Sequence, residues 1–339
     1  MSGQILKTSV AIVILALAFS FPAAAKNWNQ NEVIIYPGDG ITNEGWAIPW
    51  DKWPSYGTAK IYLSRYLHNY RQYENIEIGP STNPKKLVSI DSSSTVIQKE
   101  MQNSSLLSYL LYDKGKIIVD EITPRFDGKI DNDTLLYSMS IGKSLTSYIL
   151  GHAICDGYID GLSQKVNDWG LLKNTLYENQ SLLDLVNMNT GDYRHVNENE
   201  GMIASGRWYN NHSIKSLAER ELKGTRPSLK KYNYNGIPPN IVFGYVMHKT
   251  ADNFYPFIDK IFREHIGIGR KLLQNKNSPI DAHGSIKAVF FASRYDFLRI
   301  AVAMLKDWKE GSCVGKYLQD VHQFRISKKA NMPGGKKWD

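Results

Sequence analysis

The amino-acid sequence predicts an α/β (α+β) fold, in which an antiparallel sheet with packed helices adjoins a mainly helical lobe. Three observations predict it: two short apolar runs flank a turn cluster near residue 114, a helical pattern begins near residue 140, and interrupted helical periodicity extends to about residue 275. The chain has 339 residues, of which 42% are hydrophobic and 22% charged. This composition is typical of globular proteins and suffices for one large or two moderate domains.

The first element is a hairpin. Residues 106–111 and 116–120 are apolar runs around Asp113-Lys114-Gly115, a cluster of turn-forming residues, so we expect two antiparallel strands. A late helix is expected after Ser293, because Ser293 and Asp296 form a capping-box pattern before an apolar helical face that reaches Leu305.

The stretch between these elements, Tyr137–Gly157, predicts a buried helix. Gly157 is a plausible stop signal. The expected inward face follows the i, i+3, i+4, i+7 pattern and consists of Leu145, Tyr148, Ile149 and His152.

Ser140 and Lys143 form a Ser-x-x-Lys motif at the start of this helix. Positions i and i+3 share one helix face, so both side chains would point into the same space. The positive end of the helix dipole favours the negative charge of an alkoxide or oxyanion there. A buried lysine with a lowered pKa can take the proton of a serine hydroxyl. The motif alone is weakly specific, because a second one occurs at Ser228–Lys231.

The run Tyr137–Ser147, Tyr-Ser-Met-Ser-Ile-Gly-Lys-Ser-Leu-Thr-Ser, resembles the nucleophile helix of the serine β-lactamase-like superfamily. That superfamily includes penicillin-binding proteins, class C β-lactamases, related esterases and 6-aminohexanoate-dimer hydrolases. Residues 110–121, 151–160 and 182–191 resemble further segments of the family, in the family's order. The resemblance implies a β-lactamase/transpeptidase-like fold with the site at the seam between the sheet and the helical lobe.

In this family a tyrosine from the helical lobe, within Tyr-x-Asn or a variant, also faces the nucleophile. Two tyrosines are candidates, Tyr232 and Tyr234, and neither gives a strict Tyr-x-Asn. The spacing to Gly244 favours Tyr234 by resemblance to the esterase and dimer-hydrolase branches. The resemblance thus implies Ser140, Lys143 and Tyr234 as catalytic residues, although both tyrosines could instead be packing residues.

The family's Lys-Thr-Gly or His-Thr-Gly element is missing, and His283-Gly284-Ser285 is only a near match that comes too early. After the helix at Ser293 the chain shows no alternating strand pattern and ends in a polar tail. By resemblance we therefore expect a C-terminally truncated chain that lacks inner strands and is weakly active or prone to aggregation.

Residues 1–25 contain Lys7, an apolar run from Val10 to Phe21, and Ala23-Ala24-Ala25. This pattern predicts a signal peptide and a periplasmic or secreted protein, with no membrane span after cleavage. An uncleaved anchor is the alternative. We expect an N-terminal extension at 26–85 and the hydrolase domain at 86–339, with its helical lobe at about 160–275.

The net charge of +8 is scattered along the chain and accompanies no nucleic-acid-binding motif. The chain has two cysteines, Cys155 and Cys313. Export would permit a disulfide, but a free buried thiol is favoured for Cys155 because it lies in the apolar helix. No spacing resembles a metal site, and no cofactor is expected.

These observations predict an exported serine hydrolase that cleaves an ester, amide or peptide-like small molecule through an acyl-enzyme. A Ser-His-Asp triad is less favoured, and the Gly-x-Ser-x-Gly elbow of the α/β hydrolases is absent. The alternatives are a penicillin-binding D-alanyl-D-alanine peptidase or β-lactamase and, from another class, a non-catalytic envelope-binding protein.

Overall fold

The computed structural model describes residues 74–90, 93–103, 106–124, 130–197, 201–202, 213–276 and 286–327. The expected signal peptide, most of the expected extension, and His283 lie outside these ranges. None of the helices within them is both long enough and apolar enough to cross a membrane.

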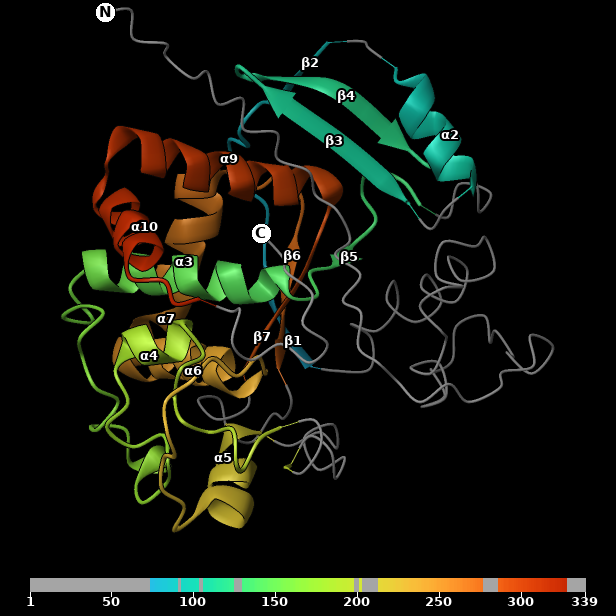
Figure 1. Ribbon diagram of the computed structural model, residues 1–339. Coiled ribbons are helices and arrows are strands. Elements are labelled where there is room, and N and C mark those ends of the chain that lie inside the picture. The colour runs from blue at the N-terminus through green and yellow to red at the C-terminus, as the bar shows by residue number, and fades with distance from the viewer. Residues whose placement is uncertain are drawn as a thin grey trace, which may run out of the picture.

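A four-stranded antiparallel sheet forms the centre of the molecule (Figure 1). Its strands, in spatial order, are β1 (Glu74–Ile78), β6 (Leu272–Lys276), β7 (Ile286–Ala292) and β5 (Leu136–Tyr137). The antiparallel sheet expected from the sequence is therefore present. Strand β1 lies within the segment expected as an extension, and it pairs with β6 along its whole length.

A second, three-stranded sheet has the order β2 (Val88–Ser89), β4 (Lys116–Ile122), β3 (Ser108–Asp113). Strands β3 and β4 are antiparallel, which confirms the predicted hairpin, and β2 runs parallel to β4. Helix α2 (Thr95–Asn103) lies beside this sheet at one edge of the molecule (Figure 1).

Helix α9 (Arg294–Glu310) connects the two sheets. On one face, Leu298 and Val302 pack with Leu110 and Ile117 of the hairpin, while the opposite face belongs to the main hydrophobic core. An ion pair of 2.7 Å between Arg294 Nη2 and Asp120 Oδ1 adds a polar tie to β4. The hairpin is thus attached to the body of the protein through α9.

The buried helix predicted for Tyr137–Gly157 is present as α3 (Ile141–Cys155). Its expected inward face is confirmed, because Leu145, Tyr148, Ile149 and His152 are all buried. Helix α3 packs against α6 (Ile237–Thr250), against β7, and against α10 (Cys313–Gln323). Helix α6 is apolar on nearly all sides and correspondingly buried.

The helical lobe is built from short helical segments (Figure 1). They are η5 (Gly170–Leu172), α4 (Leu182–Val186), α5 (Ile214–Leu217), η6 (Ala218–Leu222), η7 (Ala251–Asn253), α7 (Phe254–Asp259) and η8 (Lys260–Ile266). Among them, α4, α5, α7 and η7 pack against α6.

Helix α3 is held at its start by close packing on β7 and at its end by a disulfide. At its start, a Cβ on Gly142 would overlap the carbonyl oxygen of Ala288 in β7, so the helix lies directly on the strand backbone. At its end, Cys155 forms a disulfide with Cys313, at a Cα–Cα distance of 5.9 Å. The sequence-based preference for a free Cys155 is therefore wrong, since the packing of α10 on α3 brings together two residues that are 158 positions apart.

After β7 the described chain consists of α9 and α10 and contains no further strand up to Ser327. The expectation of missing inner strands stays a prediction.

Candidate active site

Ser140 lies at the turn between β5 and α3, where it is the N-cap residue of the helix. The turn is fixed to β7 by Ser138, whose backbone N–H donates to the Phe290 carbonyl at 2.8 Å and whose Oγ accepts from the Phe290 N–H at 3.0 Å. Met139 has a φ of 47°, which is uncommon for a residue other than glycine. Such strain is retained where the surrounding structure imposes it, often at functional sites. Here the strained residue lies between the end of β5 and Ser140.

Lys143 lies one helical turn after Ser140, as the motif predicts. Its Nζ is 3.5 Å from Ser140 Oγ, at the outer limit of a hydrogen bond. Burial of the ammonium group lowers the pKa of Lys143 to about 8. A neutral amine is therefore accessible near neutral pH, and a neutral amine can accept a proton from the serine.

Tyr234 reaches Ser140 from the segment that precedes α6. Its hydroxyl donates to Ser140 Oγ at 2.6 Å, and its ring centroid lies 5.0 Å from Lys143 Nζ. Burial raises the pKa of Tyr234, although the hydrogen bond to Ser140 opposes this shift. Ser140 Oγ thus has a phenol on one side and a lysine amine on the other, in a half-buried environment. Tyr232, the other candidate, packs with its ring centroid 6.4 Å from that of Tyr234.

No protein-family model matches the chain, and no curated protein matches it in sequence. Among the solved structures with a similar fold is a protein from Bacillus anthracis provisionally named 6-aminohexanoate-dimer hydrolase. The two chains share 13% sequence identity at a TM-score of 0.56, over 83% of this chain and 74% of that chain. At this identity the similarity concerns the fold, and it agrees with the mixed α/β architecture.

Asp192, which is not among the residues predicted from the sequence, holds the tyrosine segment in place. Asp192 is fully buried, and its carboxylate accepts hydrogen bonds from Asn233 Nδ2 at 2.6 Å, from Asn235 Nδ2 at 3.0 Å and from the Tyr177 hydroxyl at 2.7 Å. The two asparagines flank Tyr234 on either side. The signal available in the sequence was an acid directly after the Leu182–Gly191 segment together with an Asn-Tyr-Asn tripeptide.

The second Ser-x-x-Lys motif is not on a helix. Ser228 lies in a loop, where its Oγ donates to the Gly191 carbonyl at 2.8 Å. Lys231 Nζ lies 3.2 Å from the ring centroid of Tyr193. The two motif residues therefore contact different neighbours.

Another partly buried lysine, Lys287, lies on β7. Burial lowers the pKa of Lys287 to about 8, as it does for Lys143. The carbonyl oxygen of its neighbour Ala288 lies against Gly142 of α3, and the Ala288 backbone N–H donates a hydrogen bond of 2.8 Å to Asn240 Oδ1. A change of activity with pH near 8 therefore has two candidate groups, Lys143 and Lys287.

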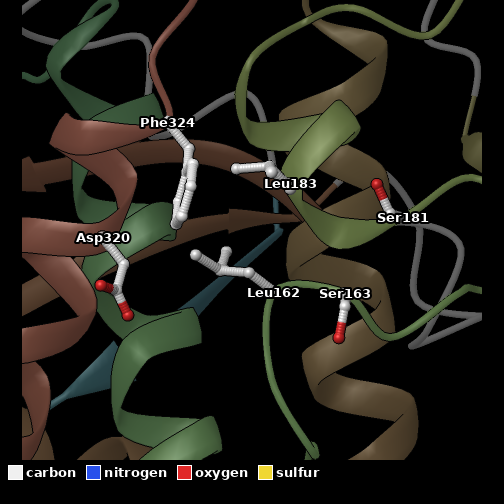
Figure 2. A pocket seen from close by; sticks show the side chains of 6 residues that line it. All are labelled: Leu162, Ser163, Ser181, Leu183, Asp320 and Phe324. Atoms are coloured by element: carbon white, nitrogen blue, oxygen red, sulfur yellow. The ribbon is translucent and has the colours of Figure 1, made fainter.

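A separate pocket of about 470 Å³ opens between α4, α10 and the 162–163 turn (Figure 2). Figure 2 shows Phe324 pointing between Leu162 and Leu183, with Asp320 and two serines at the sides. One of the serines, Ser181, already caps α4 by accepting from the Asp184 N–H at 3.1 Å. Ser181 Oγ also donates to Asp184 Oδ2 at 2.6 Å, so its hydroxyl is engaged in the helix cap. The described residues that line the pocket include no lysine or histidine beside a serine, so the candidate chemistry lies at Ser140.

Proposed function

We propose that this protein is a serine hydrolase that cleaves an ester or amide bond of a small molecule through an acyl-enzyme on Ser140. One observation carries the proposal: Ser140 Oγ lies within 2.6 Å of the Tyr234 hydroxyl and 3.5 Å of the Lys143 amine, at the N-terminus of a buried helix. The fold similarity to a protein named as a hydrolase supports it.

The proposed reaction begins when Ser140 Oγ attacks the carbonyl carbon of the substrate. The hydroxyl proton passes to the neutral amine of Lys143, and the carbonyl oxygen becomes an oxyanion near the helix N-terminus, stabilised by the Ser140 backbone N–H. Collapse of this intermediate breaks the bond to the leaving group. Tyr234 donates a proton to the departing oxygen or nitrogen and regains one from Lys143.

Water then completes the cycle. It attacks the acyl carbon while its proton passes to the Lys143 amine, and the bond between Ser140 Oγ and the acyl group breaks. The proton returns to Ser140 through Tyr234, so the enzyme is restored and the net reaction is hydrolysis. No external cofactor enters this scheme.

The test is turnover by the purified chain. We expect hydrolysis of p-nitrophenyl esters of short acids, or of the linear 6-aminohexanoate dimer suggested by the structural neighbour's name, and loss of it in Ser140→Ala. Release of product at an equal rate by Ser140→Ala would contradict the proposal. Turnover of a chromogenic cephalosporin would instead favour the β-lactamase alternative, while no turnover and no reaction with a fluorophosphonate would favour the binding protein.

We further propose export of the mature chain. The pattern of residues 1–25 and the Cys155–Cys313 disulfide support this, because disulfides persist in oxidising compartments. N-terminal sequencing of exported material is expected to begin at Lys26, and material that begins at Met1 would contradict cleavage.

A further inference from the structure

A second cluster of polar side chains lies toward the other end of α3. It brings together His152 of α3, His265 of η8 and Asp307 of α9, and the ligand-type atoms of the three residues all lie within 4.8 Å of one another. The three residues are far apart in the sequence, so no local motif marks the cluster. It is distinct from the Ser140 site.

Asp307 is buried, and its carboxylate is held in place by hydrogen bonds. Its Oδ2 lies 2.9 Å from His265 Nε2 and accepts a hydrogen bond from the Tyr148 hydroxyl, while its Oδ1 accepts from Ser312 Oγ at 3.0 Å. The Tyr148 hydroxyl is also 3.1 Å from His265 Nε2. The carboxylate and one imidazole are therefore already adjacent.

His152, the third member of the cluster, has a buried ring nitrogen, Nε2, with no hydrogen-bond partner among the described residues. Its side chain is only 8% exposed. The ring meets the His265 ring edge-on, with centroids 4.9 Å apart. A buried imidazole nitrogen normally has a partner, so an isolated one beside a second histidine and a carboxylate needs an explanation.

We propose that His152, His265 and Asp307 form a divalent metal site that takes Zn²⁺. Imidazole nitrogen and carboxylate oxygen are ligands that Zn²⁺ binds at about 2.0–2.2 Å. Ligand atoms now within 4.8 Å must draw closer to one another, and His265 can move because its side chain is 39% exposed and lies at the surface. Water takes the fourth position on the exposed side of His265.

Such a metal ion would join three separate elements at one point. It would connect the nucleophile helix to η8 and α9, close to the disulfide that ties Cys155 of α3 to Cys313. A ligand that binds the folded chain and not the unfolded chain raises the melting temperature. We therefore assign the site a structural role and no part in acyl transfer.

The test uses the full chain without an affinity tag, in buffer free of reductant so that no thiol contributes. Titration with Co²⁺ is expected to give saturable one-to-one binding with the visible absorption of a tetrahedral ion, and Zn²⁺ is expected to displace it and raise the melting temperature. Absence of saturable binding by the native chain would overturn the proposal.

His265→Ala is the decisive variant, since this side chain is partly exposed, and His265→Gln is a second variant that keeps hydrogen-bonding capacity. Each is expected to weaken Co²⁺ binding by at least about 100-fold, because loss even of a group that only supports a ligand costs about 10–100-fold. His322→Ala, an exposed histidine of α10, is the control and is expected to bind normally. Unchanged binding in the His265 variants, or equal loss in the control, would overturn the proposal.

Discussion

The two Ser-x-x-Lys motifs of this chain share a spacing but not a structure. Ser140 and Lys143 lie on the first turn of α3 and meet there, with Tyr234 completing the group. Ser228 lies in a loop and bonds to a backbone carbonyl, while Lys231 covers a tyrosine ring.

The difference teaches that the spacing acquires chemical meaning only on a buried helix. The helix places i and i+3 on one face, and burial lowers the pKa of Lys143 to about 8. The second motif therefore supplies matched control substitutions in the same chain.

The largest contrast is expected between Ser140→Ala and Ser228→Ala. Loss of the nucleophile is expected to lower kcat by about 10⁶-fold, the scale seen when a serine protease loses its nucleophile. Ser228→Ala is expected to retain turnover, because its hydroxyl only bonds to the Gly191 carbonyl. Steady-state rates on one ester substrate measure both. Equal losses would show that the comparison between the motifs is wrong.

Next comes Lys143→Ala, compared with Lys231→Ala. Proton transfer by a positioned group is worth about 10²–10⁴-fold, so the first change is expected to cost that much in kcat. The second is expected to leave kcat unchanged, with circular dichroism as the check on folding. A full rate in Lys143→Ala would remove Lys143 from its role as base.

Tyr234→Phe is expected to lower kcat by about 10²-fold, near the lower end of the range for a proton-transfer group. The loss is smaller than for Lys143→Ala because Lys143 still contacts Ser140. Tyr232→Phe is the matched control and is expected to retain its rate. If Tyr232→Phe is impaired and Tyr234→Phe is not, then Tyr232 and not Tyr234 is the catalytic tyrosine.

The pH profile sharpens the assignment of the base. Burial lowers the pKa of Lys143 to about 8, so the neutral fraction of the amine, and with it kcat/KM, is expected to rise about tenfold per pH unit below 8 and to level off above it. Lys287 has a similar pKa. Lys287→Met is therefore expected to preserve this rise of kcat/KM with pH. If the rise disappears in Lys287→Met, the titrating group is Lys287 of β7 and not Lys143.

The smallest effect is expected from Asp192→Asn. The buried carboxylate accepts from three donors, and an amide can accept fewer, so at least one donor loses its partner. We expect a loss of about 1–3 kcal/mol in the free energy of unfolding, measured with urea. Asp259→Asn, at a partly exposed ion pair with Arg263, is the control, with an expected change below about 1 kcal/mol. A stable Asp192→Asn protein would contradict the supporting role.

The elements predicted from the sequence are those with local causes. The hairpin at Asp113–Gly115 follows from turn residues between apolar runs. Helix α9 begins after Ser293, whose Oγ accepts from the Asp296 N–H at 3.1 Å as an N-cap does. The inward face of α3 follows from periodicity. The contact between Ser140 and Lys143 is local too, because it spans one helical turn.

What the sequence could not supply depends on tertiary packing. The partner of Cys155 is decided by how α10 lies on α3, and the neighbours of His152 are decided by η8 and α9. Asp192 supports Tyr234 through asparagines about 40 residues later in the chain. No local period or spacing encodes such contacts. The choice of Tyr234 over Tyr232 came from the resemblance and not from the residues themselves.

The most direct measurement of the central claim is the site of covalent modification. The purified chain is treated with a fluorophosphonate, its intact mass is recorded, and the modified peptide is sequenced by mass spectrometry. Ser140 should carry a single adduct that is absent from Ser140→Ala and retained in Ser228→Ala. An adduct on Ser228, or one that survives in Ser140→Ala, would contradict the account.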